Sequence, residues 1–194
     1  MMNLIQIKKI VWFIGLVLFC SSCITIIIIK GKGIHSGYNE LSESEKERIV
    51  FLSDIEQIKD HVDTVIFAIT APQLKNYINQ FDSCLIYFWS PFCASPNCKS
   101  PEIVQNYCKT NHLHLILIVE DYSSAQYLLT ILSLFEQPAF VINSFYYKTD
   151  FCPIYVPKFK HDFIGRKSRK DNHARYYIYH ASSYKAVNTI DEKE

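Results

Sequence analysis

The chain of 194 residues has little glycine, little charge and no strong excess of charge of one sign. Five glycines and seven prolines exclude a collagen-like or glycine-rich low-complexity protein. Charged residues make up 20% of the chain and apolar residues 49%, a balance that excludes an intrinsically disordered protein. The length fits one main domain, and 13 tyrosines and 13 phenylalanines are enough to fill a core.

The charge is also too evenly balanced for a nucleic-acid-binding protein. The net charge is +1, but residues 1–32 hold four lysines and no acidic residue. The remaining chain has 16 basic and 19 acidic residues, a net charge of −3, so it has no excess of positive charge for binding DNA or RNA. Because the sequence also lacks a glycine-rich phosphate loop, we expect neither a nucleic-acid partner nor a cofactor.

The N-terminal segment predicts attachment to a membrane. Residues 10–29 carry no charge and are flanked by Lys8–Lys9 and Lys30. As a helix, twenty residues at about 1.5 Å each span a hydrocarbon core of about 30 Å. Residues 1–32 therefore form either a transmembrane anchor, which we favour, or a lipoprotein signal cut before Cys23. A slight excess of positive charge before the run favours a body on the periplasmic, extracytoplasmic side.

The rest of the chain alternates predicted strands and helices. Residues 33–62 are interpreted as a linker and an acidic helix, which begins with a capping box at Ser42–Glu45 and continues at helical spacing to Ile58. In residues 63–150 we expect strands at 64–69, 84–89, 113–119, 139–143 and 145–149, and helices at 70–81, 96–109 and 123–136. This alternation predicts an α/β fold with helices on both faces of a mostly parallel sheet. Residues 151–194 are interpreted as a basic C-terminal extension with one strand at 176–179.

The most informative segment follows the predicted strand 84–89 and reads Trp89-Ser-Pro-Phe-Cys93-Ala-Ser-Pro-Asn-Cys98-Lys-Ser-Pro101. It resembles the active-site segment of thioredoxin-fold proteins, where W-x-P-W-C-x-x-C leads into a helix with an internal proline. Trp89 stands four residues before Cys93, and Phe92 takes the aromatic position next to it. Farther on, Gln137–Pro138 matches the cis-proline loop of that family.

The resemblance covers roughly residues 60–150 and implies a thioredoxin-like three-layer α/β/α sandwich with a mixed central sheet. With the membrane segment, the chain is most similar to the TlpA/ResA-type thiol–disulfide oxidoreductases of bacteria. The resemblance implies that Cys93 attacks a protein disulfide and that Cys98 resolves the mixed disulfide. It also implies that a cis Pro138 presents backbone to the substrate, while Trp89 and Phe92 shape the substrate groove.

Two departures from the family pattern leave the role of the cysteines open. The second cysteine of C-x-x-C would be residue 96, which is proline, and Cys98 instead gives C-x4-C. On one continuous helix the Cα atoms of Cys93 and Cys98 would be roughly 8–9 Å apart, beyond the limit of about 7 Å for a disulfide. A helix that starts at Ser95–Pro96 would leave Cys93 on a loop within reach of Cys98. The buried acid of the family falls at Tyr87.

The sequence therefore predicts a membrane-anchored extracytoplasmic oxidoreductase whose partner is a protein thiol or disulfide. A non-catalytic interaction module of the same fold, with a structural disulfide, is the main alternative. A third is copper delivery, as in Sco-type proteins of this fold, because His112 and His114 could join Cys93 and Cys98 as ligands. The remaining cysteines at 84 and 108 are expected to pack in the core, with Cys152 as an odd thiol.

Overall fold

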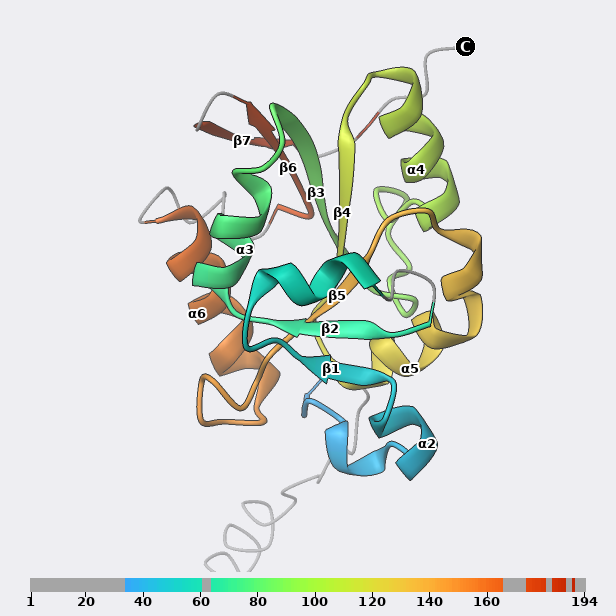
Figure 1. Ribbon diagram of the computed structural model, residues 1–194, viewed down its shortest axis with the longest axis vertical. Helices are drawn as coiled ribbons and strands as arrows, with labels where there is room; N and C mark the ends of the chain where they lie inside the picture. Colours follow the sequence, from blue (N-terminus) through green and yellow to red (C-terminus); the bar gives the residue numbers. More distant parts are fainter. Residues whose placement is uncertain (1–33, 61–63, 166–173, 181–182, 188–189, 191–194) are drawn as a thin grey trace, which may run out of the picture. The chain divides into compact units, whose positions relative to one another are not determined.

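The computed structural model describes residues 34–60, 64–165, 174–180, 183–187 and 190, which build one seven-stranded mixed sheet (Figure 1). The strand order is β1-β2-β5-β4-β3-β6-β7. The first five strands in this order are parallel to one another. Strand β6 is antiparallel to β3, and β7 is antiparallel to β6. Their bounds are β1 Ile49–Phe51, β2 Ile66–Ile69, β3 Ser83–Trp89, β4 His114–Val119, β5 Ala139–Ile142, β6 Tyr176–His180 and β7 Ser183–Val187.

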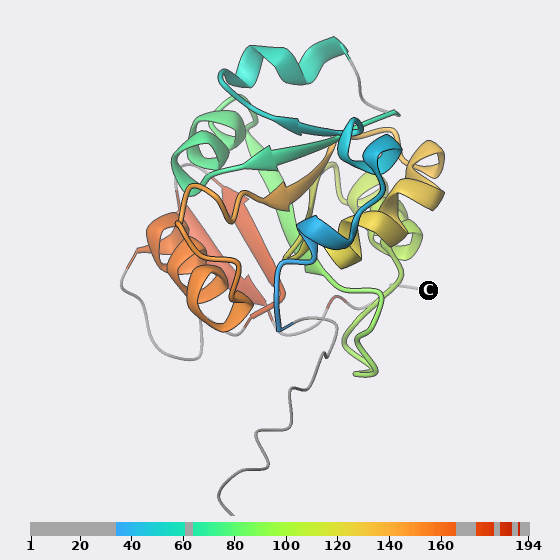
Figure 2. The ribbon, with the colours of Figure 1, turned by 90° about the horizontal axis from the view of Figure 1, so that it is seen from below.

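Helices cover both faces of the sheet, so the predicted α/β class and its mixed sheet in three layers are confirmed. On one face lie α3 (Ala71–Ile78) and α6 (Cys152–Ile164), and on the other lie α4 (Pro101–Thr110) and α5 (Tyr122–Ile131). Figures 1 and 2 show the two pairs on opposite sides of the strands. The short helix α2 (Glu43–Lys46) and three 3-10 segments, Tyr38–Glu40, Ile55–Asp60 and Leu132–Leu134, complete the elements.

The continuous apolar run of β3 follows from burial on both faces. Cys84, Ile86 and Phe88 belong to the core under α3 and α6, whereas Leu85, Tyr87 and Trp89 belong to the core under α4 and α5. Successive side chains of a strand point to opposite faces, so a strand covered twice needs apolar residues at every position.

Helix starts follow local capping signals. The side chain of Thr70 accepts a hydrogen bond from the Gln73 N–H, and Gln73 reaches back to the Thr70 N–H in a capping box, as the sequence predicts. The Asp121 side chain accepts a hydrogen bond from the Ser124 N–H at the start of α5, close to the predicted start at residue 123. These caps satisfy backbone donors that a helix leaves without intrahelical partners.

Residues 49–51 and 145–149 form different secondary structure from the expected elements. The predicted helix after Ser42 ends at Lys46, and Ile49–Phe51 instead form β1, the edge strand that pairs with β2. β-branched and aromatic residues favour the sheet once a partner strand is present, and this tertiary pairing overrides the helical spacing. The predicted strand 145–149 is a turn, in which Lys148 adopts a positive φ of 56°.

The C-terminal residues are part of the sheet rather than an extension of it. The predicted strand near 176–179 is confirmed as β6, which pairs antiparallel with β3 through Tyr87 and Tyr176. Within the predicted extension, residues 152–164 form α6, in which Phe159 and Phe163 are buried. Residues from 32 onward make one compact unit, so no boundary separates residue 150 from residue 151.

The predicted membrane segment at 10–29 lies outside the described residues. None of the helices in the described ranges has the length and apolar composition that crossing a bilayer requires.

Candidate functional site

Cys93 and Cys98 form a disulfide on the loop 90–100, which connects the carboxyl end of β3 to α4. Their Cα atoms lie 6.1 Å apart, within the expected reach, and both residues are half-buried. Each sits at the end of a tight turn, because the Cys93 N–H donates to the Ser90 carbonyl (3.2 Å) and the Cys98 N–H to the Ser95 carbonyl (2.9 Å). These turns fold the loop back so that the two sulfurs meet. Figure 2 shows the loop projecting from the body of the domain.

Neither cysteine belongs to a helix, which corrects the expected helix start at Ser95–Pro96. Helix α4 begins at Pro101, with Ser100 as its N-cap. Pro101 takes the first helical position, where proline is favoured because it lacks the N–H that would have no partner there. Cys98 therefore lies before the first turn of α4, and the field of the helix N-terminus acts on it less than the sequence suggested.

Two tyrosines from neighbouring antiparallel strands hold the loop on the Cys98 side. The Tyr87 hydroxyl donates to the Lys99 carbonyl (2.7 Å). The Tyr176 hydroxyl donates to the Asn97 carbonyl (2.7 Å) and accepts from the Lys99 N–H (3.3 Å). The two rings are stacked with centroids 4.5 Å apart and are fully buried. The two tyrosine hydroxyls thus bind backbone groups on both sides of Cys98.

Tyr87 stands where the family has a buried acid, and its environment keeps its hydroxyl protonated. Burial raises the pKa of Tyr87 far above its usual value, with a further increase from the contact with Tyr176. The residue therefore acts as a hydrogen-bond donor to the loop and not as a proton acceptor at neutral pH.

One cation lies in this loop and a second lies next to the end of β3. Lys99 follows Cys98 directly, and Arg175 stands at the start of β6, next to the end of β3. The Arg175 guanidinium donates to the Phe88 carbonyl (3.2 Å), and the Phe88 N–H donates to the Arg175 carbonyl (2.8 Å). The sequence does not predict this position of Arg175, because no pattern in it indicates that β6 pairs with β3.

The two expected groove residues have different environments. Trp89 is buried at the end of β3, where its ring packs at a centroid distance of 5.9 Å from Tyr127 of α5. Phe92 is exposed on the disulfide loop, next to Cys93. Of the two, Phe92 is therefore the one placed at the surface where a partner could contact it.

The expectation for Pro138 is wrong. The described residues contain no cis peptide bond, so the Gln137–Pro138 peptide is trans. Pro138 precedes β5, in which Val141 pairs with Val119 of β4, and Val119 pairs with Trp89. Pro138 lies three residues before Val141, about 10 Å back along the strands, and two strands away from β3. It is at the amino edge of the parallel strands, whereas Cys93 follows the carboxyl edge.

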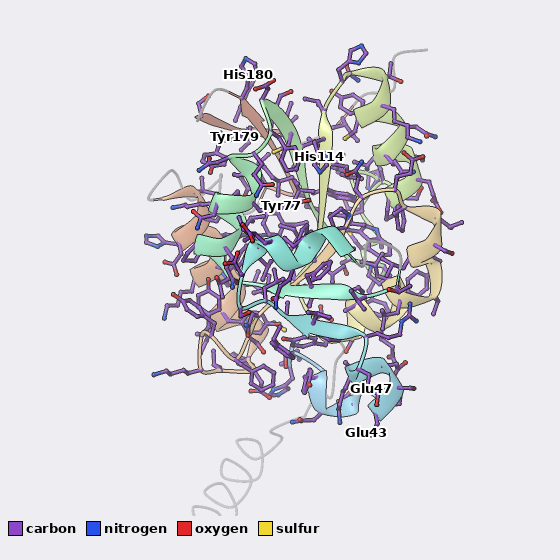
Figure 3. All side chains as sticks on the ribbon, viewed as in Figure 1. Glu43, Glu47, Tyr77, His114, Tyr179 and His180 are labelled. Atoms are coloured by element: carbon purple, nitrogen blue, oxygen red, sulfur yellow. A yellow bond between two sulfur atoms is a disulfide. The ribbon has the colours of Figure 1, made fainter. Side chains whose placement is uncertain are left out.

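The histidines are also remote from the disulfide. His114 opens β4 at its amino end, and His112 lies in the preceding turn with a positive φ. Six residues of strand put roughly 20 Å between that end and the disulfide edge. His114 stacks on Phe81 at a centroid distance of 3.7 Å and lies 6.4 Å from the Tyr77 ring (Figure 3), and burial lowers its pKa to about 4. The described ranges hold no group of three potential ligand side chains for a metal.

Cys84, Cys108 and Cys152 form no disulfide and are buried, so the core packing predicted for Cys84 and Cys108 is confirmed, and Cys152, predicted as an odd thiol, is buried as well. Burial raises the pKa of Cys84 and of Cys108 to about 12, and that of Cys152 to about 11. These three residues remain protonated thiols at neutral pH, so among the cysteines in the described ranges only the Cys93–Cys98 pair has the exposure that thiol chemistry with another protein needs.

Comparison of the chain with known protein families, curated proteins and solved structures finds no match.

Proposed function

We propose that the chain is a thioredoxin-like thiol–disulfide oxidoreductase, tethered by residues 10–29 with its domain on the extracytoplasmic side, that exchanges disulfides with protein thiols. The observation that carries the proposal is the half-exposed Cys93–Cys98 disulfide on the loop leaving the carboxyl end of β3. A short disulfide ring at the surface, next to an exposed aromatic side chain, is accessible to the thiolate of a partner.

The arrangement around β3 supports the family resemblance. Strands β3 and β4 are parallel and connected by α4, and the antiparallel hairpin β6–β7 extends the sheet on the other side of β3. This four-stranded unit is similar to the thioredoxin core, in which the segment facing the first cysteine leads into the antiparallel strand. Residues 174–175 occupy that place here, and no proline stands at either position. A cis-proline contact with substrate is therefore not part of the proposal.

The proposed exchange uses both sulfurs. In the reduced form, the Cys93 thiolate attacks one sulfur of a substrate disulfide, and the other substrate sulfur leaves as a thiolate that takes up a proton. The Cys98 thiolate then attacks Cys93 Sγ in the mixed disulfide and releases the second substrate thiol. The Cys93–Cys98 disulfide forms, so two electrons pass to the substrate, and a dithiol protein returns the pair to its reduced form.

The assignment of the two roles follows from the loop. Cys93 is adjacent to exposed Phe92, whereas the backbone on both sides of Cys98 is bound by Tyr87 and Tyr176. Cys93 is therefore the attacking sulfur and Cys98 the resolving one. Lys99 and Arg175 add positive charge beside the loop, which favours thiolate where the helix N-terminus contributes less.

Trapping tests the proposal. In the full chain, Cys98→Ser should accumulate a mixed disulfide through Cys93 with partner proteins, because the resolving thiol is missing. Cys93→Ser should accumulate none, and the control Cys108→Ala, a buried thiol outside the loop, should behave like the wild type. The reduction potential of the pair should lie between about −270 and −120 mV.

A structural disulfide in a non-catalytic interaction module is the second candidate. It is favoured by the fact that both cysteines lie outside the first turn of α4, on a loop that two buried tyrosines hold in place. This candidate predicts a potential below about −300 mV and no covalent partner for either serine variant. The same two measurements thus decide between the candidates.

A further inference from the structure

Half of the large hydrophobic residues that are strongly exposed in the described ranges lie within one stretch of ten residues. Phe145, Tyr146, Phe151 and Ile154, here called the 145–154 patch, have between 36% and 56% of their surface exposed. They occupy the turn after β5 and the start of α6. Clustered exposed apolar side chains indicate a surface that binds something, whereas scattered single ones do not.

The first described residues of the chain are bonded directly beside this patch. The Ile34 carbonyl accepts a hydrogen bond from the Cys152 N–H (2.9 Å), and the Ser36 N–H donates to the Asp150 carbonyl (2.6 Å). The ring of His35 packs edge-on against Phe151 at a centroid distance of 5.7 Å. The chain therefore enters the domain at the patch.

The length of the preceding chain limits how far the patch can be from the apolar segment. Residue 29, the last of the uncharged run, stands five residues before Ile34. Five residues reach at most about 18 Å when fully extended. If residues 10–29 span a bilayer, the 145–154 patch is held within this distance of the bilayer surface.

The chemistry of the patch fits the interfacial region of a bilayer. Aromatic rings with apolar bodies are favoured at the level of lipid headgroups, and lysines beside them can extend toward phosphate groups. Lys148 within this segment and Lys158, four residues after it, are exposed, and the Lys158 ammonium lies 5.6 Å from the centre of the Tyr147 ring. The acidic residue of the segment, Asp150, is paired with His35 at 3.1 Å.

We propose that the 145–154 patch docks on the lipid surface, with its aromatic and aliphatic side chains in the headgroup region of the membrane that holds the chain. This inference rests on the proposed anchor. The turn after β5 and the disulfide loop after β3 both leave the carboxyl edge of the parallel strands. Docking therefore orients the disulfide edge of the domain toward the membrane, where thiols of membrane-bound proteins are the reachable partners.

Photo-crosslinking of the full chain tests the docking. The chain is reconstituted in vesicles of phosphatidylcholine and phosphatidylglycerol that contain a lipid with a diazirine near its headgroup, and crosslinked residues are identified by mass spectrometry. We expect lipid adducts both within 10–29 and within 145–154. Leu134 is equally exposed but lies before the amino end of β5, at the opposite edge, and should carry none.

Variants make the test specific to the patch. Replacing Tyr146 and Ile154 together by serine removes two exposed side chains and should reduce adducts at 145–154 by about tenfold, with adducts at 10–29 unchanged. The control Leu134→Ser should change neither. Adducts at 10–29 without any at 145–154 would overturn the docking and leave the anchor in place. Adducts at Leu134 as frequent as those at 145–154 would also overturn the docking. Absence of adducts at 10–29 would overturn the anchor itself.

Discussion

At the scale of single residues, Tyr87 and Tyr176 determine the shape of the disulfide loop. Their hydroxyls make three hydrogen bonds to backbone groups of Asn97 and Lys99 from a fully buried position. Loss of one hydroxyl leaves a partly buried carbonyl or N–H of the loop without its hydrogen bond, which costs about 1–3 kcal/mol. The position of Cys98 thus depends on residues of β3 and β6.

Removing one of these hydroxyls should destabilise the oxidised protein. Tyr176→Phe deletes two of the three hydrogen bonds while the stacked ring remains, so we expect a loss of about 1–3 kcal/mol in the free energy of unfolding. Denaturant unfolding followed by circular dichroism measures it. Tyr127→Phe, at an exposed position of α5, is the control and should change stability by less than about 0.5 kcal/mol. Equal effects of the two substitutions would contradict the role given to Tyr176.

His114 should make stability depend on pH in a defined window. Burial lowers its pKa to about 4 from a usual value of 6.5. Between these two pH values the unfolded chain binds a proton that the folded chain does not, so the free energy of unfolding falls as pH falls. Above pH 6.5 the full stability is present, and by pH 4 about 3 kcal/mol of it is lost.

The variant His114→Leu isolates this contribution. Because the other titratable groups are the same in both proteins, their effects cancel in the difference between variant and wild type. That difference should shift in favour of the variant by about 3 kcal/mol between pH 7 and pH 4, as measured by urea unfolding at each pH. A difference that is constant with pH would show that His114 is not desolvated in the fold.

At the scale of elements, α6 is attached to the sheet by a buried ion pair. The Lys160 ammonium lies 2.7 Å from a Glu120 carboxylate oxygen and 4.5 Å from the centre of the Phe88 ring. Lys160 is buried although it belongs to residues 151–194, which the sequence analysis interprets as a basic C-terminal extension. The aliphatic stem and the charge of this lysine therefore both contribute to the contact between α6 and the end of β4.

A double-mutant cycle tests the pair. Lys160→Met and Glu120→Gln should each destabilise the protein, because each leaves a charged partner with less compensation. The free energy of unfolding of the double variant should fall by about 1–3 kcal/mol less than the sum of the two single decreases. The reason is that the double variant no longer holds a buried charge without its partner. Thermal and denaturant unfolding of the four proteins give the coupling energy. Strictly additive losses would mean that the two charges do not interact in solution.

At the scale of the whole molecule, the sheet needs residues from both halves of the chain. Strand β6 covers the side of β3 that would otherwise be an open edge, and Tyr176 meets Tyr87 there. Exposed edges of apolar strands promote aggregation because their backbone groups seek partners. We therefore expect the residues after 165, which supply β6 and β7, to be required for folding.

Truncations should separate these roles. A chain that begins at residue 33 should fold cooperatively, because residues 32–194 are one compact unit. A chain that also ends at residue 165 should aggregate or remain unfolded, since the edge of β3 and the Tyr87 ring lose their cover. Circular dichroism and gel filtration distinguish the outcomes. A folded, monomeric 33–165 fragment would show that β6 and β7 are dispensable.

The sequence by itself determined those features of the fold that depend on residues close together in the chain. The capping box at Thr70–Gln73 and the buried strands at 84–89 and 113–119 are local, because caps and burial runs involve residues close in the chain. The sequence leaves the Cys93–Cys98 pairing open, because it depends on where α4 begins. The α/β class follows from the alternation of such elements.

Only the tertiary structure decided which strands are neighbours, and this changed the candidate site. Residues 49–51 pair with β2 and become a strand, β5 joins the far side of β4 and removes Pro138 from the disulfide, and β6 brings Arg175 and Tyr176 beside the loop. Strand order is set by burial and pairing between segments far apart in the chain, and no spacing within a segment encodes it.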